Sequence, residues 1–216
     1  MILLIVLILL RYNEMATKTQ IEILKLLISS PEKPLTIRGI ARALHKSYTL
    51  VYNNLASLEK EKIIASESVP PARIITLNPF APSEMLIDIE QERKREFLKK
   101  YPWAQVMLED ALSAAKDIFL IVMVFGSYAK GKETPKSDID LLIVVDEKRK
   151  ISSMEGIFQN IYTKIKKGVH VVDADNFKVM IKNSNELNIG NEAKKHHIIM
   201  YGAEAYYQLL KNAGVR

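Results

Sequence analysis

The fold of this chain is decided by one stretch, Val124-Phe-Gly-Ser-Tyr-Ala-Lys-Gly-Lys-Glu-Thr-Pro-Lys-Ser-Asp-Ile-Asp-Leu-Leu-Ile-Val-Val145. An apolar run over 119–125 has the length and composition of a buried strand and ends at Gly126. Asp138 and Asp140 open a second apolar run. Because alternate side chains of a strand share a face, both carboxylates are expected to point the same way.

The residues between these two strands favour phosphate and a divalent metal ion. A short helix starting near Ser127 would present free backbone N–H groups to an anion. Three lysines add positive charge nearby: Lys130, Lys132 and Lys136. Two close carboxylates repel one another unless a cation lies between them, and Mg²⁺ prefers oxygen ligands together with substrate phosphates. The stretch therefore predicts a site for phosphoryl or nucleotidyl transfer.

This pattern resembles the nucleotidyltransferase superfamily that includes DNA polymerase beta, and most closely its minimal, stand-alone members. The matching residues are Gly126, Ser127, Ser137, Asp138, Asp140 and Leu141. The resemblance implies an NTP substrate and a catalytic Asp138–Asp140 pair that binds Mg²⁺ or Mn²⁺. Nucleotide contacts are expected from Gly126, Ser127, Lys130, Lys136 and Ser137.

Members of that superfamily usually carry a third acid on a later strand, and here that position falls on His170. The candidate strand covers 168–175, and Asp173 and Asp175 lie on its opposite face if the strand is regular. Three interpretations remain open. His170 acts as a ligand or base, a register shift or bulge brings Asp173 into the catalytic site, or the third acid is absent and nucleotide turns over slowly or not at all.

The remainder of this region is consistent with a small α/β unit. A crossover helix is predicted over 152–167, with Ile157, Ile161 and Ile165 at four-residue spacing. The segment 198–210 resembles the end of many minimal nucleotidyltransferases. Packing roles are expected for its tyrosines, Tyr201, Tyr206 and Tyr207.

The N-terminal part predicts a winged helix-turn-helix domain over 15–80. A first helix is expected over 17–27, a second capped by Thr36 and ending near Leu44, and a third capped by Ser47 and ending near Glu61. Two short apolar runs within 63–77 flank a polar loop with two prolines, which predicts a β-hairpin. Three helices followed by a hairpin wing form the plan of that domain.

Resemblance to winged helix-turn-helix domains implies contact with double-stranded DNA, because their third helix commonly enters the major groove. The expected DNA-binding residues are Ser47, Tyr48, Thr49, Tyr52, Asn53, Ser57 and, on the wing, Arg73. Residues 15–80 contain nine Lys or Arg against five Glu and no Asp, so their net charge of +4 favours a phosphate partner. The alternatives are a solvated basic face, or a winged helix used for protein contact or dimerisation.

Length and composition bound the organisation of the chain. Its 216 residues allow one or two domains, and the two sets of motifs divide the chain near residues 80–100. The expected fold class is α/β (α+β), in which residues 104–216 form the nucleotidyltransferase-like mixed sheet flanked by helices. The charge-rich segment 81–103 predicts an exposed linker helix between the halves. The absence of cysteine excludes disulfides and thiolate metal sites, and a cytoplasmic location is expected.

An apolar extension covers residues 1–14, of which the first ten are purely apolar. That run is shorter than the ~20 residues of a membrane helix, so stable membrane insertion is not expected. It also lacks the basic region and cleavage site of a signal peptide. The preferred interpretation is a start assigned too early, with Met15 as the true start. A weak anchor and a strand that pairs with a partner are the alternatives.

Two functions follow from these features. The first is an enzyme that transfers a nucleoside monophosphate from an NTP to a hydroxyl acceptor, brought to its target by the winged helix. The second is a transcriptional regulator or antitoxin whose degenerate nucleotidyltransferase domain senses a nucleotide. Resemblance to minimal nucleotidyltransferases also implies a helical partner protein, and winged helices often act as homodimers.

Overall fold

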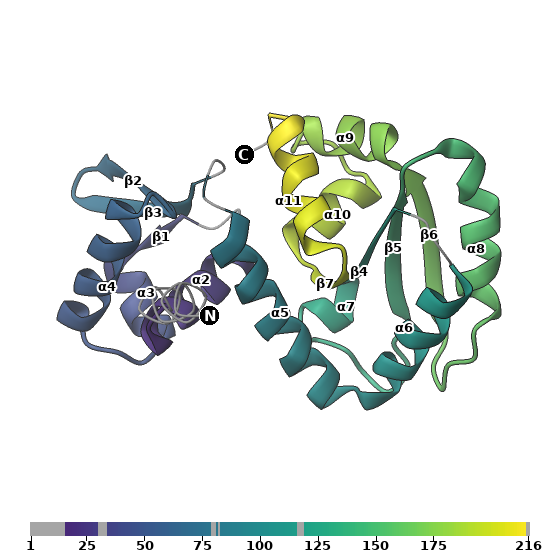
Figure 1. The fold of residues 1–216 in the computed structure, drawn as a ribbon. Helices are drawn as coiled ribbons and strands as arrows, with labels where there is room; N and C mark the ends of the chain where they lie inside the picture. Colours follow the sequence, from purple (N-terminus) through teal and green to yellow (C-terminus); the bar gives the residue numbers. More distant parts are fainter. Residues whose placement is uncertain (1–15, 30–33, 79–80, 82, 116–118, 215–216) are drawn as a thin grey trace, which may run out of the picture. The chain divides into compact units, whose positions relative to one another are not determined.

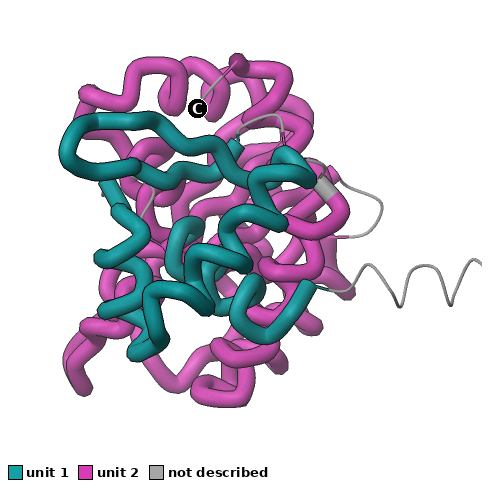
Figure 2. The backbone as a smooth tube through the Cα atoms, turned by 90° about the vertical axis from the view of Figure 1, so that its left-hand side faces the viewer, with its two compact units in different colours: residues 1–28, 33–78 teal, residues 29–32, 79–216 magenta. Residues whose placement is uncertain are grey.

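The computed structural model describes residues 16–29, 34–78, 81, 83–115 and 119–214. The chain divides into two compact units, residues 1–28 with 33–78 and residues 29–32 with 79–216 (Figure 2). The apolar extension over 1–14 lies outside the described residues. Within the described ranges, no helix is both long enough and apolar enough to span a lipid bilayer.

The described part of the N-terminal unit contains three helices and a small antiparallel sheet. The helices are α2 (Lys18–Ser29), α3 (Ile37–Ala43) and α4 (Tyr48–Lys60), and the strands are β1 (Leu35–Thr36), β2 (Ile64–Val69) and β3 (Ala72–Leu77). The strand order is β1-β3-β2, with β2 and β3 forming a hairpin. Three helices followed by a hairpin wing confirm the predicted winged helix-turn-helix (Figure 1).

Side-chain caps start two of these helices at the predicted residues. The hydroxyl of Thr36 accepts a hydrogen bond from the backbone N–H of Gly39 at 3.0 Å, and that of Ser47 accepts one from Leu50 at 3.3 Å. Each cap satisfies a backbone N–H that has no partner inside the helix. Helix α4 then buries one apolar stripe, formed by Val51, Leu55 and Leu58. The caps and the stripe together fix which face of α4 remains exposed.

The C-terminal unit is a four-stranded sheet with helices on both faces. Its strands are β4 (Leu120–Phe125), β5 (Ile139–Val145), β6 (Lys167–Asp173) and β7 (Ile198–Tyr201). Its helices are α5 (Ser83–Lys100), α6 (Pro102–Ala114), α7 (Gly126–Ala129), the 3₁₀ turn η1 (Lys148–Lys150), α8 (Ile151–Asn160), α9 (Ala174–Lys182), α10 (Ile189–Lys195) and α11 (Ala203–Asn212). The strand order is β6-β5-β4-β7, and only β5 and β6 are parallel. The predicted mixed α/β architecture is confirmed.

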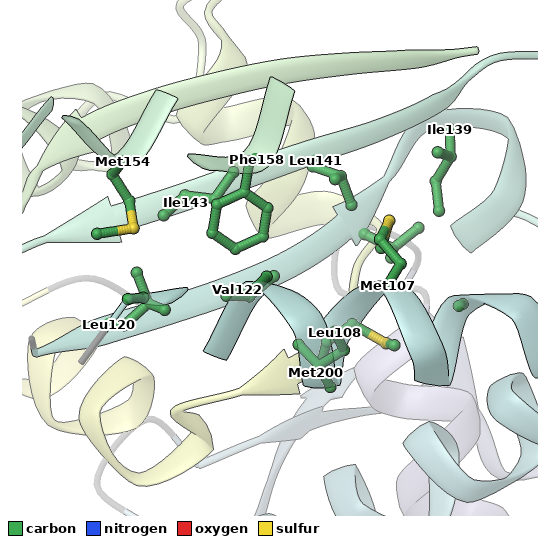
Figure 3. Packing of buried hydrophobic residues seen from close by; sticks show 14 of the residues in the cluster. Met107, Leu108, Leu120, Val122, Ile139, Leu141, Ile143, Met154, Phe158 and Met200 are labelled. Atoms are coloured by element: carbon green, nitrogen blue, oxygen red, sulfur yellow. The ribbon is translucent and has the colours of Figure 1, made fainter. Parts of the chain in front are cut away.

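Strand alternation separates two apolar cores on the two faces of this sheet. On one face Leu141 and Val122 pack with Phe158 of α8 and with Met107 and Leu108 of α6 (Figure 3). The opposite face packs against α9, α10 and α11, through Phe177, Ile181, Ala193, Tyr206 and Leu209. Asp140 points to this second face, because it shares the parity of Leu142 and Val144 along β5.

The crossover helix is shorter than predicted, because α8 ends at Asn160 and not near residue 167. Ile161 already has extended backbone angles, φ −67° and ψ 132°. Ile161 and Ile165 nevertheless pack against the first core from the connection that follows the helix. Their four-residue spacing therefore reflects burial and not a continued helix.

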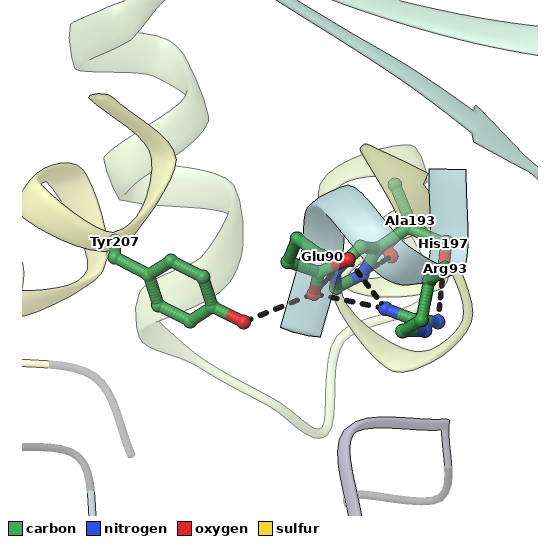
Figure 4. Close-up of polar contacts among 5 residues, drawn as sticks. All are labelled: Glu90, Arg93, Ala193, His197 and Tyr207. Atoms are coloured by element: carbon green, nitrogen blue, oxygen red, sulfur yellow. Dashed lines mark hydrogen bonds and ion pairs between the residues drawn. The ribbon is translucent and has the colours of Figure 1, made fainter. Parts of the chain in front are cut away.

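Helix α5 is an integral part of the C-terminal unit, so the prediction of an exposed linker helix is wrong. Glu90 and Arg93 are only 1% and 5% exposed. Arg93 donates to the Glu90 carboxylate at 2.7 and 2.8 Å and to the carbonyl oxygen of His197 at 2.5 Å (Figure 4). Tyr207 donates to Glu90 at 3.0 Å. These contacts compensate the cost of burying two charges, and they join α5 to β7 and α11.

The same contacts keep Glu90 ionised. Burial alone would raise the pKa of Glu90, but the guanidinium of Arg93, with His197 and Tyr207, brings it below the ordinary value of 4.5. His197 Nε2 lies 3.5 Å from Glu90 Oε1, while His197 Nδ1 is 2.9 Å from the carbonyl oxygen of Ala193. We name these four side chains, Glu90, Arg93, His197 and Tyr207, the buried polar cluster.

The C-terminal tyrosines differ in their packing. Tyr206 is buried in the second core, and Tyr207 belongs to the buried polar cluster, as their predicted packing roles require. Tyr201 is half exposed at the end of β7, so the packing role predicted for it is wrong. Ile199 and Met200, which precede it, are buried in the second and the first core, so the exposure of Tyr201 reflects its place as the last residue of β7.

Candidate functional site

The carboxylate of Asp140 lies in a slot between two glycines. Asp140 is opposite Phe125 on β4 and Gly168 on β6. A Cβ atom added to Gly126 would be 2.1 Å from Asp140 Oδ2, and one added to Gly168 would be 3.0 Å from Oδ1. Neither glycine can be replaced without moving the carboxylate, because the first distance is far below contact and the second is tight. We name Gly126, Asp140 and Gly168 the aspartate slot.

Gly126 is required for a second reason. Its φ is +68°, in the left-handed region where side chains other than glycine are strained. This conformation turns the chain from β4 directly into α7, which carries Ser127. The predicted Gly-Ser turn is therefore present, and Gly126 lies against Asp140, fourteen positions later in the sequence.

His170 lies beside the aspartate slot on β6. It is opposite Leu142 in a regular parallel register, so it shares the face of Asp140. The Cβ position of Gly168 is 3.5 Å from His170 Nε2, and the imidazole ring lies 6.0 Å from the Phe125 ring, measured between centroids. Of the residues considered for the third position, His170 is the one that this register brings to Asp140.

Asp173 is not brought to the slot, and the alternative of a register shift or bulge is wrong. The pairing of β5 with β6 stays regular and places Asp173 opposite Val145, at the far end of the sheet. Its carboxylate caps α9, accepting from Asn176 N at 3.0 Å and from Asn176 Nδ2 at 2.6 Å. Burial would raise the pKa of Asp173, but these hydrogen bonds from Asn176 lower it. Asp175 lies in the first turn of α9 and pairs with Lys178.

Glu192 is a member of the site that the sequence did not indicate. It lies on α10, where its Oε2 is 3.4 Å from Nζ of Lys130 in the loop after α7. Burial raises the pKa of Asp140, charge on His170 opposes that shift, and the carboxylates of Asp138 and Glu192 add to it. Glu192 is fifty-two positions from Asp140 in sequence, so only the folded sheet brings the two acids into electrostatic range.

The loop before β5 is ordered by Ser137. Its hydroxyl accepts a hydrogen bond from the N–H of Thr134 at 2.9 Å, and its own N–H donates to the Thr134 carbonyl at 2.9 Å. This closed turn presents Asp138 and Lys136, both exposed, at the start of β5. Ser137 therefore shapes the loop, while the Lys136 ammonium and the Asp138 carboxylate face solvent.

The donor chemistry of these residues fits a divalent metal ion that arrives with substrate phosphates. Asp138 and Asp140 offer carboxylate oxygens, which Mg²⁺ and Mn²⁺ accept. Among the residues that the structure describes, however, no three His, Asp or Glu side chains are gathered closely enough to hold a metal ion. Mg²⁺ is commonly bound by one or two carboxylates plus phosphate oxygens, so two protein ligands suffice for such an ion.

The residues predicted to bind DNA divide into exposed and engaged groups. Tyr48, Thr49, Tyr52 and Asn53 are exposed on α4. Ser47, by contrast, caps the helix, and Ser57 donates to Glu61 at 2.9 Å. Arg73 donates to both carboxylate oxygens of Glu59, at 2.7 and 2.8 Å, and to Ser66. The wing arginine is therefore held against α4 by a bidentate ion pair.

Comparison with known proteins extends these findings. Residues 108–203 match the family described as "Polymerase beta, Nucleotidyltransferase". A comparison with curated proteins gives no match. The matched range contains the aspartate slot, Asp138, His170 and Glu192.

Two solved structures also share local similarity with the chain. One is MepR, a transcription regulator of the Staphylococcus aureus multidrug efflux pump MepA, with 22% identity, a TM-score of 0.33, and coverage of 50% of this chain and 84% of that one. The other is the adhesin competence repressor AdcR from Streptococcus pyogenes, with 25% identity, a TM-score of 0.30, and the same two coverages. TM-scores of this size do not bear on fold or function. What the comparisons establish is that residues 108–203 are similar to nucleotidyltransferases of the polymerase beta family.

Proposed function

We propose that the protein is a metal-dependent nucleotidyltransferase that moves a nucleoside monophosphate from an NTP to a hydroxyl acceptor. The observation that carries this proposal is the aspartate slot, a catalytic-type carboxylate held between Gly126 and Gly168 inside the range that matches the family. The acceptor hydroxyl would lose its proton to solvent as its oxygen forms a bond to the α-phosphorus. The bond from that phosphorus to its bridging oxygen would break, and pyrophosphate would leave.

Each residue of the site has a role in this proposal. Asp138 and Asp140 would hold Mg²⁺ or Mn²⁺, which when bound would neutralise charge on the triphosphate. Backbone N–H groups at Gly126 and Ser127, with the ammonium groups of Lys130 and Lys136, would contact the phosphates. His170, beside Asp140, would orient the acceptor hydroxyl.

We further propose that the N-terminal unit binds double-stranded DNA. Its winged helix-turn-helix fold, its net charge of +4 over 15–80 and the exposed polar face of α4 support this assignment. DNA binding would bring the transfer site to its target.

The proposed transfer is tested with α-labelled NTPs in the presence of Mg²⁺ or Mn²⁺. DNA, RNA and proteins of a cell lysate serve as acceptors. The Asp138→Asn/Asp140→Asn variant is expected to transfer at least about 100-fold less label than the wild type, because the metal ligands lose their charge. Asp146→Asn is the matched control, since Asp146 follows the opposite end of β5 and pairs with Lys150 at 2.7 Å. A wild-type protein that transfers no label to any acceptor would contradict the enzyme proposal.

A regulator with a nucleotide-sensing domain is the second candidate function. One observation favours it, namely His170 in place of an acid on β6. Such a protein, an antitoxin or repressor acting as a homodimer or with a helical partner, would bind NTP without transfer. NTP would then change its affinity for DNA, which fluorescence anisotropy of a labelled duplex measures with and without nucleotide.

A further inference from the structure

The exposed face of α4 carries a pair of stacked tyrosines. Tyr48 and Tyr52 are 49% and 46% exposed, and their rings stack with centroids 6.2 Å apart and planes inclined by 16°. Leu50 is also exposed on this helix. Scattered apolar residues on a surface need no explanation, but several grouped on one helix of a small domain mark a contact surface.

Most polar groups around this surface are already engaged. Asn54 donates to the carbonyl of Leu50 at 2.8 Å, and its Oδ1 accepts from the hydroxyl of Thr17 at 2.7 Å. As described above, Ser57 is bonded to Glu61, and Arg73 to Glu59. These residues shape the N-terminal unit, and their polar groups are unavailable without breaking internal contacts.

Asn53 is different from its neighbour Asn54. It is exposed, and its amide makes no hydrogen bond with any residue in the described part of the chain. Thr49 is exposed one helical turn earlier and shares its face. The face formed by Tyr48, Thr49, Tyr52 and Asn53 therefore offers one free amide, hydroxyls and two aromatic surfaces. We name these four residues the α4 reading face.

The chemistry of the α4 reading face matches one kind of base pair. An Asn amide pairs its donor and acceptor with N7 and N6 of adenine, and apolar groups contact the thymine methyl. Guanine presents two acceptors and is read by Arg or Lys, but α4 has no basic residue before Lys60. Arg73, the basic residue of the wing, is neutralised by Glu59.

The geometry points to A·T base pairs as the sequence that α4 reads, an inference that rests on the DNA-binding part of the proposed function. Asn53 contacts adenine in the major groove, and the Tyr48–Tyr52 pair packs against thymine methyl groups. Affinity for the phosphate backbone comes from exposed basic residues outside the reading face. Four of these have no acidic partner within the described ranges: Arg38, Arg42, Lys60 and Lys62. This division separates the groups that specify sequence from those that supply affinity.

The test begins with selection by the full chain of binding sites from a pool of random duplexes. A·T-rich sites are expected, and fluorescence anisotropy then measures the affinity for a selected duplex and for the same duplex with one A·T pair changed to G·C. Asn53→Ala should reduce the preference between the two by about tenfold. Asn53→Arg should shift the preference toward the G·C duplex, because its guanidinium pairs with guanine.

Lys60→Ala is the matched control on the same helix. It should weaken binding to both duplexes equally and lower the salt dependence of binding, leaving the preference unchanged. Selection of G·C-rich sites, or an unchanged preference in Asn53→Ala, would overturn the inference while DNA binding stands. A protein that binds no duplex at all would overturn the DNA-binding proposal itself. Because Asn53 is exposed, both Asn53 variants are expected to fold, and circular dichroism checks that they do.

Discussion

Helices α4 and α5 distribute their side chains in opposite ways. Helix α5 is rich in charge, yet it buries Glu90 and Arg93 inside the C-terminal unit. Helix α4 has the amphipathic pattern of a packed helix, yet it leaves two tyrosines and a leucine in water. The two buried charges of α5 are satisfied by the chain itself, through the buried polar cluster. Among the described residues, the rings of α4 stack on one another and remain half exposed, which is the property expected of a surface that binds something else.

Removing one charge from the buried polar cluster should produce the largest effect on stability. Arg93→Ala leaves the Glu90 carboxylate buried without its guanidinium, which costs about 3–5 kcal/mol of the free energy of unfolding. Urea denaturation followed by circular dichroism measures this loss. Arg95→Ala is the control, because the Arg95 side chain is 71% exposed and its ion pair with Glu92 contributes about 0–1 kcal/mol. Equal losses of stability in Arg93→Ala and Arg95→Ala would show that the buried position of Arg93 makes no difference to its contribution.

Acid should weaken the same cluster. The pKa of Glu90 is lower in the folded protein than its ordinary value of 4.5, so its stabilising contribution is complete above that value. The contribution is lost as the pH falls below 4.5 and through the lowered pKa. In Glu90→Gln the carboxylate is gone, so this variant should be less stable than the wild type at pH 7. The difference in the free energy of unfolding between the wild type and Glu90→Gln should become smaller in acid. Urea midpoints for both proteins between pH 7 and pH 3 measure it, and a gap independent of pH would contradict the assignment.

The smallest effect on stability is expected on α4. Tyr52→Ala should change the free energy of unfolding by no more than about 0.5 kcal/mol, because the ring is half exposed and stacks on the equally exposed Tyr48. Leu55→Ala, on the buried stripe of the same helix, should cost about 2–5 kcal/mol. Thermal or urea unfolding of the two variants measures the difference. A large loss in Tyr52→Ala would show that the tyrosine pair stabilises the fold and would weaken its role as a contact surface.

The fold was largely predictable because its signals are local. Thr36 and Ser47 cap helices within three residues of themselves, and the apolar strand on each side of the Gly-Ser turn needs no distant partner to be recognised. The prediction that α5 is an exposed linker helix was wrong because Arg93 and Glu90 make hydrogen bonds with His197 and Tyr207, which lie more than a hundred positions away in sequence. Residues 161–165 were assigned to a helix because apolar spacing reports burial, which a connection can also provide.

The candidate site divides in the same way. Gly126, Asp138 and Asp140 could be predicted as site residues because a glycine turn and the start of an apolar strand are recognisable from local sequence. Gly168 and Glu192 could not, since a glycine in a strand and an acid on a helix are common until the sheet places them beside Asp140. Asp173 was a reasonable candidate by composition, but a helix cap competes for the same residue type.

The membership of α5 in the C-terminal unit determines where the chain can be divided into independent fragments. A break between Asn78 and Glu84 keeps α5 in the same fragment as the four-stranded sheet. A break after residue 103, where the sequence predicts the end of a linker, would remove Glu90 and Arg93 from the fragment that contains His197 and Tyr207. A fragment that keeps the C-terminal unit intact therefore begins at the charged helix α5.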